Sequence, residues 1–183
     1  MASKLGIEKI EKNLFALEEQ LDLVLTENRK IVRNCSNAIK ALHAHDFKEA
    51  EKNLAEAKKD LSKLLPYQKE FPSQVDHVLQ EYAEAMIVQY AVKTGKIPSQ
   101  KELDIPDVPY LNGLLDAIGE LKREMYESLR RKDKKKAELY FSLMEEIFDA
   151  LLPLRFSNAI LPEFRRKQDV GRIQIEQARG ELL

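Results

Sequence analysis

The segment "EYAEAMIVQYAV", residues 81–92, places two carboxylates in an otherwise almost wholly apolar sequence. Glu81 and Glu84 are three residues apart, so on a helix they share one face. The other residues are apolar on nearly every side of such a helix, which predicts a helix buried in a bundle. An ionised carboxylate in that setting is costly unless a partner accompanies it. The pair is therefore a candidate chemical site.

Two later segments repeat this pattern of carboxylates on an apolar helix. In "YLNGLLDAIGEL", residues 110–121, the strongly polar residues recur at every fourth position: Asn112, Asp116 and Glu120. In "LYFSLMEEIFDALL", residues 139–152, the polar residues are Ser142, Glu145, Glu146 and Asp149. Three consecutive helices would thus each present carboxylates from a mainly apolar surface.

Converging carboxylates repel one another unless protons or cations lie between them, so the pattern predicts a divalent-metal site. Ligands that are all oxygen favour Mg²⁺ or Mn²⁺ over zinc or copper. Such a metal can activate water and stabilise charge on a phosphodiester. His43, His45 and His77 do not provide the Glu-x-x-His pattern of a diiron bundle. The alternative is that the acidic residues face solvent or form salt bridges between helices, and the spacing leaves both interpretations open.

The elements that must position these residues are all expected to be helices, beginning with a long one. Apolar residues recur at spacings of three and four over residues 7–42, an a/d heptad with a polar a position at Asn28. Such a helix is on the order of 50–60 Å long. A compact chain of 183 residues does not easily cover it, so we expect part of the seam to meet another subunit. The seam comprises Ile7, Ile10, Leu14, Leu17, Leu21, Val24, Asn28, Ile31, Cys35, Ala38 and Leu42.

Helix signals continue to the end of the chain. Asp46 with Glu49 predicts a capping box at the start of a second helix. Further helices are expected over about 72–95, 109–131, 133–152 and 163–182, and residues 96–109 are expected to form a loop with a short turn at 99–103. No strand-like alternation occurs in the sequence. We therefore expect one all-α domain, residues 1–183, built as a bundle of about six to seven helices.

Composition restricts the classes of protein that remain. A net charge of −1, from 30 basic and 31 acidic residues, argues against a dedicated duplex-DNA binder. The single Cys35 excludes an intramolecular disulfide and fits a reducing compartment. No run approaches the roughly 20 apolar residues of a membrane span, and "MASKLGIEKIEKNL" lacks the apolar stretch of a signal peptide. We therefore expect a cytoplasmic protein with no membrane partner.

Four stretches, taken in order, resemble the translin family. They are "LQEYAEA" (79–85), "KTGKIPSQKEL" (93–103), "YLNGLLDAIGELKRE" (110–124) and "LPEFRRKQDVGRIQIEQARG" (161–180). The paired glutamates of the first stretch are similar to those of the translin-associated factor X branch, in a compact, prokaryotic-type form. The resemblance extends over nearly the whole chain.

The resemblance implies a seven-helix subunit that assembles into a closed shell, a homo-octamer, and binds single-stranded RNA, with single-stranded DNA as a second ligand. In the factor X branch it also implies a metal-dependent endoribonuclease that leaves a 5′-phosphate. The implied ligands of Mg²⁺ or Mn²⁺ are Glu81, Glu84 and Asp149, with Glu120 as a fourth ligand or as a carboxylate that orients water. Glu145 and Glu146 do not match the family pattern.

Two other kinds of protein remain open: a non-catalytic shell that binds single-stranded RNA or DNA, and a helical scaffold with no nucleic-acid role. The basic residues do not decide between them. Arg29, Lys30 and Arg33 lie within about one turn of each other on the first helix, where they could bind phosphates or form a solvated face. The basic run 165–167 begins the last helix and could contact substrate or form structural salt bridges.

Overall fold

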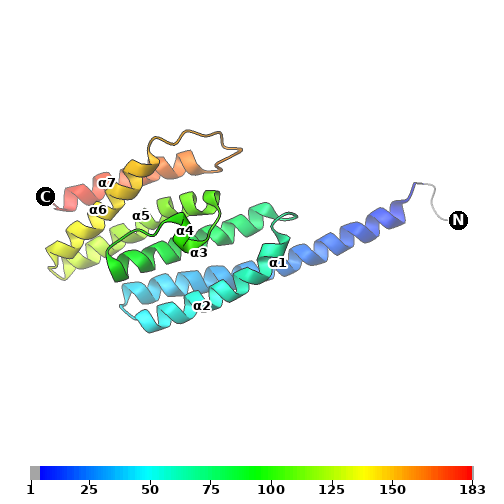
Figure 1. The fold of residues 1–183 in the computed structure, drawn as a ribbon, viewed down its shortest axis with the longest axis horizontal. Coiled ribbons are helices and arrows are strands. Elements are labelled where there is room, and N and C mark those ends of the chain that lie inside the picture. Colours follow the sequence, from blue (N-terminus) through cyan, green and yellow to red (C-terminus); the bar gives the residue numbers. More distant parts are fainter. Residues whose placement is uncertain (1–4, 183) are drawn as a thin grey trace.

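The computed structural model describes residues 5–182, which form seven α-helices, one 3₁₀ turn and no strand (Figure 1). The all-α class predicted from the periodicity is confirmed. The helices are α1 (Ile7–His43), α2 (Phe47–Leu64), α3 (Pro72–Thr94), α4 (Gln100–Leu103), α5 (Asp107–Arg130), α6 (Lys134–Leu151) and α7 (Phe164–Leu182), with the 3₁₀ turn at Leu65–Tyr67.

Local signals explain most of the helix boundaries. The Asp46 side chain accepts a hydrogen bond from the backbone N–H of Glu49, 3.0 Å away, and so caps α2. The Glu49 side chain accepts a hydrogen bond from Asn53 instead, so only this half of the predicted capping box forms. The short turn expected at 99–103 is α4, which begins with a Ser99–Glu102 capping box. Helix α5 begins two residues before the predicted start at Pro109, because proline is tolerated in the first turn of a helix.

Helix α5 lies in the middle of the bundle (Figure 1). It packs against α3 on one side and against α6 and α7 on the other, while α1 packs against α2 and α3. Because α5 lies between α3 and α6, the side chains of α3 pack against α5 rather than against α6.

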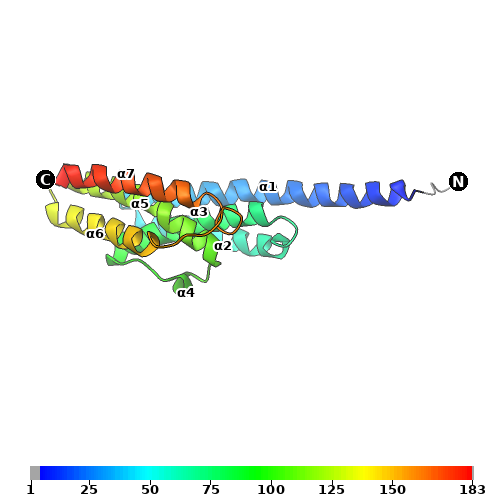
Figure 2. The same cartoon turned by 90° about the horizontal axis from the view of Figure 1, so that it is seen from above.

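Helix α1 extends well beyond the bundle (Figures 1 and 2). The heptad positions from Val24 to Leu42 are buried in the core. The apolar residues of the first half are exposed, for example Ile10 at 51% and Phe15 at 58%. Half of the predicted seam is therefore left uncovered by the rest of the described chain.

Helices α3 and α5 approach closely at Gly113. A Cβ atom at this position would lie 2.7 Å from Cβ of Ala83 and 3.1 Å from the backbone nitrogen of Glu84. Glycine therefore permits the contact between the two helices that carry the predicted acidic residues.

We expect Gly113→Ala to lower the free energy of unfolding by about 1–3 kcal/mol, because the added methyl group overpacks this contact. Gly180→Ala is the control, since Gly180 lies in α7 with open space around its Cβ position. That substitution is expected to raise the free energy of unfolding by up to about 1 kcal/mol. Urea unfolding measures both values, and equal effects would contradict the close approach.

Cys35 lies in the buried part of the α1 seam and is 1% exposed. Burial, together with the nearby charges of Glu81 and Glu84, raises the pKa of its thiol to about 12. The thiol is therefore protonated and inert at neutral pH, as expected for a core position.

Among the described residues, none of the helices combines the length and apolar character needed to cross a membrane. The cytoplasmic location expected from the sequence stays a prediction.

Candidate active site

An acidic cavity of about 450 Å³ lies between α3, α5 and α7. Its carboxylates are Glu81 and Glu84 from α3 and Asp116 and Glu120 from α5. Each pair is spaced three or four residues apart, so both members lie on the same face of their helix. The packing of α3 against α5 turns the two pairs toward one cavity. The structure thus brings together three of the predicted site residues, Glu81, Glu84 and Glu120.

The carboxylate of Glu84 occupies the least solvated part of this charge cluster. Burial raises its pKa to about 8, and the negative charges of Asp116, Glu81 and Glu120 act in the same direction. Burial likewise raises the pKa of Glu81. Within residues 5–182, neither carboxylate forms a hydrogen bond or salt bridge with another side chain. The cavity therefore concentrates negative charge that the protein only partly compensates.

Asp116 is held by residues from two neighbouring helices. Lys167 of α7 donates to both carboxylate oxygens, with 2.6 Å between Nζ and Oδ1. Gln80 of α3 donates to Oδ2 at 2.8 Å. The basic run 165–167 was expected either to contact substrate or to form structural salt bridges, and Lys167 forms a salt bridge. The side chain of Lys167 also lines the acidic cavity.

Glu120 is held by His43 at the end of α1. The distance between His43 Nε2 and Glu120 Oε2 is 2.6 Å, and His43 Nδ1 lies 2.5 Å from Oε1 of Glu124. Burial alone would lower the pKa of His43, but the hydrogen bonds to the two carboxylates outweigh it and raise the pKa to about 9. The hydrogen bond from His43 lowers the pKa of Glu120, so this carboxylate is kept ionised.

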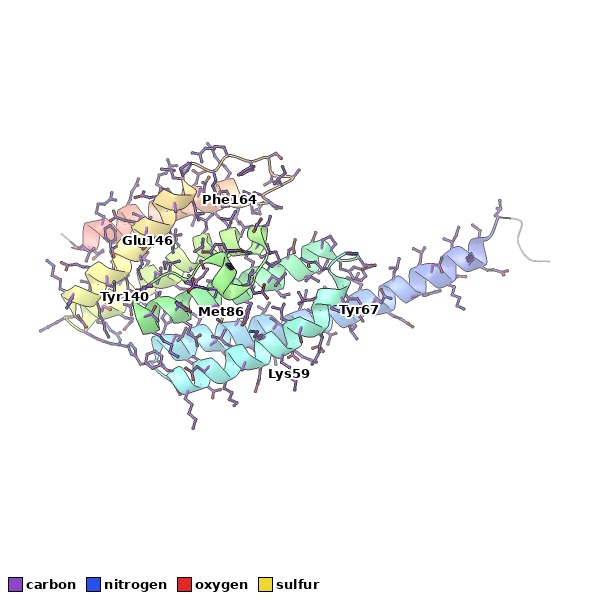
Figure 3. The ribbon with its side chains drawn as sticks, in the orientation of Figure 1. Lys59, Tyr67, Met86, Tyr140, Glu146 and Phe164 are labelled. Carbon is purple, nitrogen blue, oxygen red and sulfur yellow. The ribbon has the colours of Figure 1, made fainter. Side chains whose placement is uncertain are left out.

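Asp149 does not join these residues, which corrects the set expected from the sequence. It is exposed on α6 and lines a separate cavity of about 230 Å³, together with Arg172 and Arg179 of α7. Helix α5 lies between α6 and α3, and this explains the separation. Glu146 lies one helical turn before Asp149 on α6, and Met86 lies on α3 near Glu84. Figure 3 shows these two labelled residues in different layers of the bundle. Asp116 occupies the place in the cluster that was expected for Asp149.

The basic residues Arg29, Lys30 and Arg33 are exposed on α1 and do not line the acidic cavity. Lys30 pairs with Glu27 at 2.5 Å, and Arg29 donates to the backbone carbonyl of Leu25. Their contact with phosphate stays a prediction.

Sequence reasoning left three residues out of the site: Asp116, Lys167 and His43. Asp116 could have been included, because it lies four residues before Glu120 and therefore on the same helix face. Lys167 and His43 come from helices distant in sequence, and no local spacing connects them with α5.

The acidic cavity fits a divalent cation in its donor chemistry and in its charge. Carboxylate oxygens are hard ligands, which Mg²⁺ and Mn²⁺ prefer. In the part of the chain that the structure describes, no three acidic, histidine or cysteine side chains are already placed to bind one metal ion. Asp116 is turned toward Lys167, and Glu120 toward His43. Binding would therefore require Asp116 to exchange Lys167 for the cation.

In EDTA, the free energy of unfolding is expected to fall as pH rises from about 5 to 8. The pKa of Glu84 is about 8 in the folded protein, against an ordinary value of 4.5. Between these two pKa values the folded protein keeps the Glu84 proton, whereas the unfolded chain has released it. The contribution of Glu84 to the free energy of unfolding is therefore fully present below pH 4.5, and it is lost as the pH rises to about 8.

Urea unfolding at several pH values measures this fall, with Glu84→Gln as the comparison. The raised pKa of His43 also lowers stability with rising pH, but this contribution is common to both proteins. The difference between the two curves therefore reports on Glu84. Parallel curves would contradict the buried, protonated carboxylate.

Comparison with known proteins shows similarity over most of the chain. Residues 6–178 match the family model described as the Translin family. An uncharacterized protein of Methanocaldococcus jannaschii is 33% identical over 165 residues, which cover 87% of this chain and 73% of that protein. The AfC3PO–duplex RNA complex superposes with a TM-score of 0.84 at 28% identity, covering 96% of this chain and 94% of that one. Apo-NeC3PO gives a TM-score of 0.86 at 25% identity, covering 100% and 97%.

Proposed function

Because this chain belongs to the translin family, we propose that it binds RNA and cleaves it as a divalent-metal-dependent endoribonuclease. One structural neighbour, AfC3PO, has been solved with duplex RNA, which supports RNA as the ligand. The observation that carries the catalytic proposal is the acidic cavity, with four carboxylates beside Lys167. The assignment to the factor X branch and the preference for single-stranded RNA stay predictions.

The residues of the acidic cavity divide into three roles in this proposal. Glu81, Glu84 and Asp116 would hold Mg²⁺ or Mn²⁺, and Glu84 would release its proton to solvent on becoming a ligand. When bound, the cation supplies charge stabilisation for the phosphodiester and makes a water molecule more acidic. Glu120, kept ionised by His43, orients the attacking water and accepts its proton. Lys167, which now pairs with Asp116, would then neutralise charge on a phosphate oxygen.

The proposal includes self-association into a closed, homo-octameric shell. Support comes from the first half of α1, where exposed apolar side chains line a groove of about 600 Å³ together with Phe71. Exposed apolar surface of this kind marks a protein–protein interface. A second copy of the chain is the partner that the heptad pattern favours.

Cleavage of a labelled single-stranded RNA, with Mn²⁺, Mg²⁺ or EDTA, tests the proposed activity. The wild type is compared with Glu81→Gln/Glu84→Gln, whose oligomer size is first shown to be unchanged. A duplex of the same sequence serves as a second substrate. We expect cleavage that requires metal, favours the single strand, and is lost in the double variant.

The main alternative is a non-catalytic RNA-binding shell. RNA that is bound but not cut by the wild type, under any metal condition, would establish this alternative. Cleavage that persists in the double variant would instead show that the active site lies elsewhere.

A further inference from the structure

His43, the last residue of α1, connects that helix to α5 through both of its ring nitrogens. Nε2 contacts Glu120 at 2.6 Å, and Nδ1 contacts Glu124 at 2.5 Å. The side chain of Glu124 is only 2% exposed, whereas that of Glu120 is 27% exposed and reaches the acidic cavity. One of the two carboxylates is thus fixed in the core, and the other belongs to the candidate active site.

The contacts define the orientation of the ring and favour its charged form. A neutral imidazole carries a single N–H, so donation to both carboxylates requires the imidazolium form. The C-terminal end of a helix favours such a cation. Glu120 and Glu124 are four residues apart on one face of α5, and the ring spans the gap between them. Buried Glu124 therefore holds the Nδ1 edge of the His43 ring in place. The opposite edge of the ring presents the Nε2–H to Glu120 in a fixed direction.

We propose that His43 is a positioning residue, which holds Oε2 of Glu120 so that Oε1 stays available to the acidic cavity. This inference rests on the proposed function, in which Glu120 orients the attacking water. His43 acts through Glu120 and contacts neither substrate nor cation. Partners that orient an active-site group in this way typically contribute about 10- to 100-fold to activity or to ligand affinity.

Two variants separate the contacts of His43. The amide of His43→Gln reaches the place of Nε2 and keeps a donor for Glu120, while the amide of His43→Asn reaches the place of Nδ1 and keeps only the contact with Glu124. Each variant loses one of the two hydrogen bonds. At saturating Mn²⁺ we expect kcat to fall about 10- to 100-fold in His43→Asn and to stay within about threefold in His43→Gln. KM for RNA should stay within about threefold in both.

A double-mutant cycle with Glu120→Gln distinguishes positioning from general stabilisation. If His43 acts through Glu120, adding His43→Asn to Glu120→Gln lowers kcat no further. An equal fall in both backgrounds, or an equal fall in His43→Asn and His43→Gln, overturns the inference. If His43→Asn does not fold, a folded His43→Gln with kcat lowered more than tenfold still overturns the inference.

Crystal structures of the metal-free variants provide a measurement that does not depend on activity. The Glu120 carboxylate is expected at its wild-type position in His43→Gln and displaced in His43→Asn. An unchanged position in both variants overturns the inference. If the wild type binds RNA without cutting it, the proposed function fails, and the crystallographic comparison still decides the role of His43.

Discussion

Asp116→Asn is expected to reduce metal-dependent RNA cleavage by about 100- to 1000-fold, while Asp149→Asn stays within about threefold of the wild type. Asp116 lies among the carboxylates of the acidic cavity, where it is the α5 residue proposed to hold the cation. Asp149 lies across α5 in another cavity, beside Arg172 and Arg179. Both substitutions replace one carboxylate oxygen with an amide and preserve side-chain size, so the pair differs only in location.

Initial rates of cleavage in Mn²⁺ measure the two variants, and circular dichroism with sizing chromatography confirms that each is folded and assembled. Isothermal titration with Mn²⁺ gives an independent reading, since Asp116→Asn should weaken metal binding and Asp149→Asn should not. The reverse result, with an active Asp116→Asn and an inactive Asp149→Asn, would restore the set of residues expected from the sequence alone.

Placing charge on the projecting half of α1 is expected to break the assembly. In Leu14→Lys/Leu17→Lys, two exposed apolar residues of the seam become cationic. Each loses about 1.5–3 kcal/mol of burial free energy at a subunit contact. The oligomer should therefore dissociate into smaller species at micromolar concentration. The fold of the subunit should be retained, because neither residue contributes to the buried core.

Analytical ultracentrifugation over a range of protein concentrations measures this effect. Glu19→Lys is the matched control, since it changes the net charge by the same two units and lies opposite the seam in the heptad. We expect the control to keep the wild-type mass. A double variant that also keeps the wild-type mass would show that subunits meet through another surface.

The helices could be predicted closely from the sequence because their signals are local. The heptad from residue 7 to 42 corresponds to α1, and the loop signals before Gln100 and after Leu151 mark real boundaries. The sequence also indicated that α1 is too long for its own chain to cover. The first half of the helix is indeed exposed, whereas the buried residues of α1 lie from Val24 onward.

The acidic site was predicted only in part, because helix spacing identifies a face but not the direction in which that face points. Glu81 and Glu84 were found correctly as members of one cluster, since they lie on the same face of α3. Asp149 lies on an equally regular stripe, but the packing of α6 on the far side of α5 turns it away. His43 and Lys167 meet α5 only through tertiary packing, which no spacing rule in a single sequence contains.

The buried thiol of Cys35 has a practical consequence for site-directed spectroscopy. Maleimide and methanethiosulfonate reagents react with an accessible thiolate, and this thiol is 1% exposed with a pKa of about 12. A cysteine introduced at an exposed position, such as Glu19 on the projecting part of α1, would therefore carry a spin label or fluorophore without removal of the native residue. Distances between such labels would then map the arrangement of neighbouring subunits in an otherwise unmodified protein.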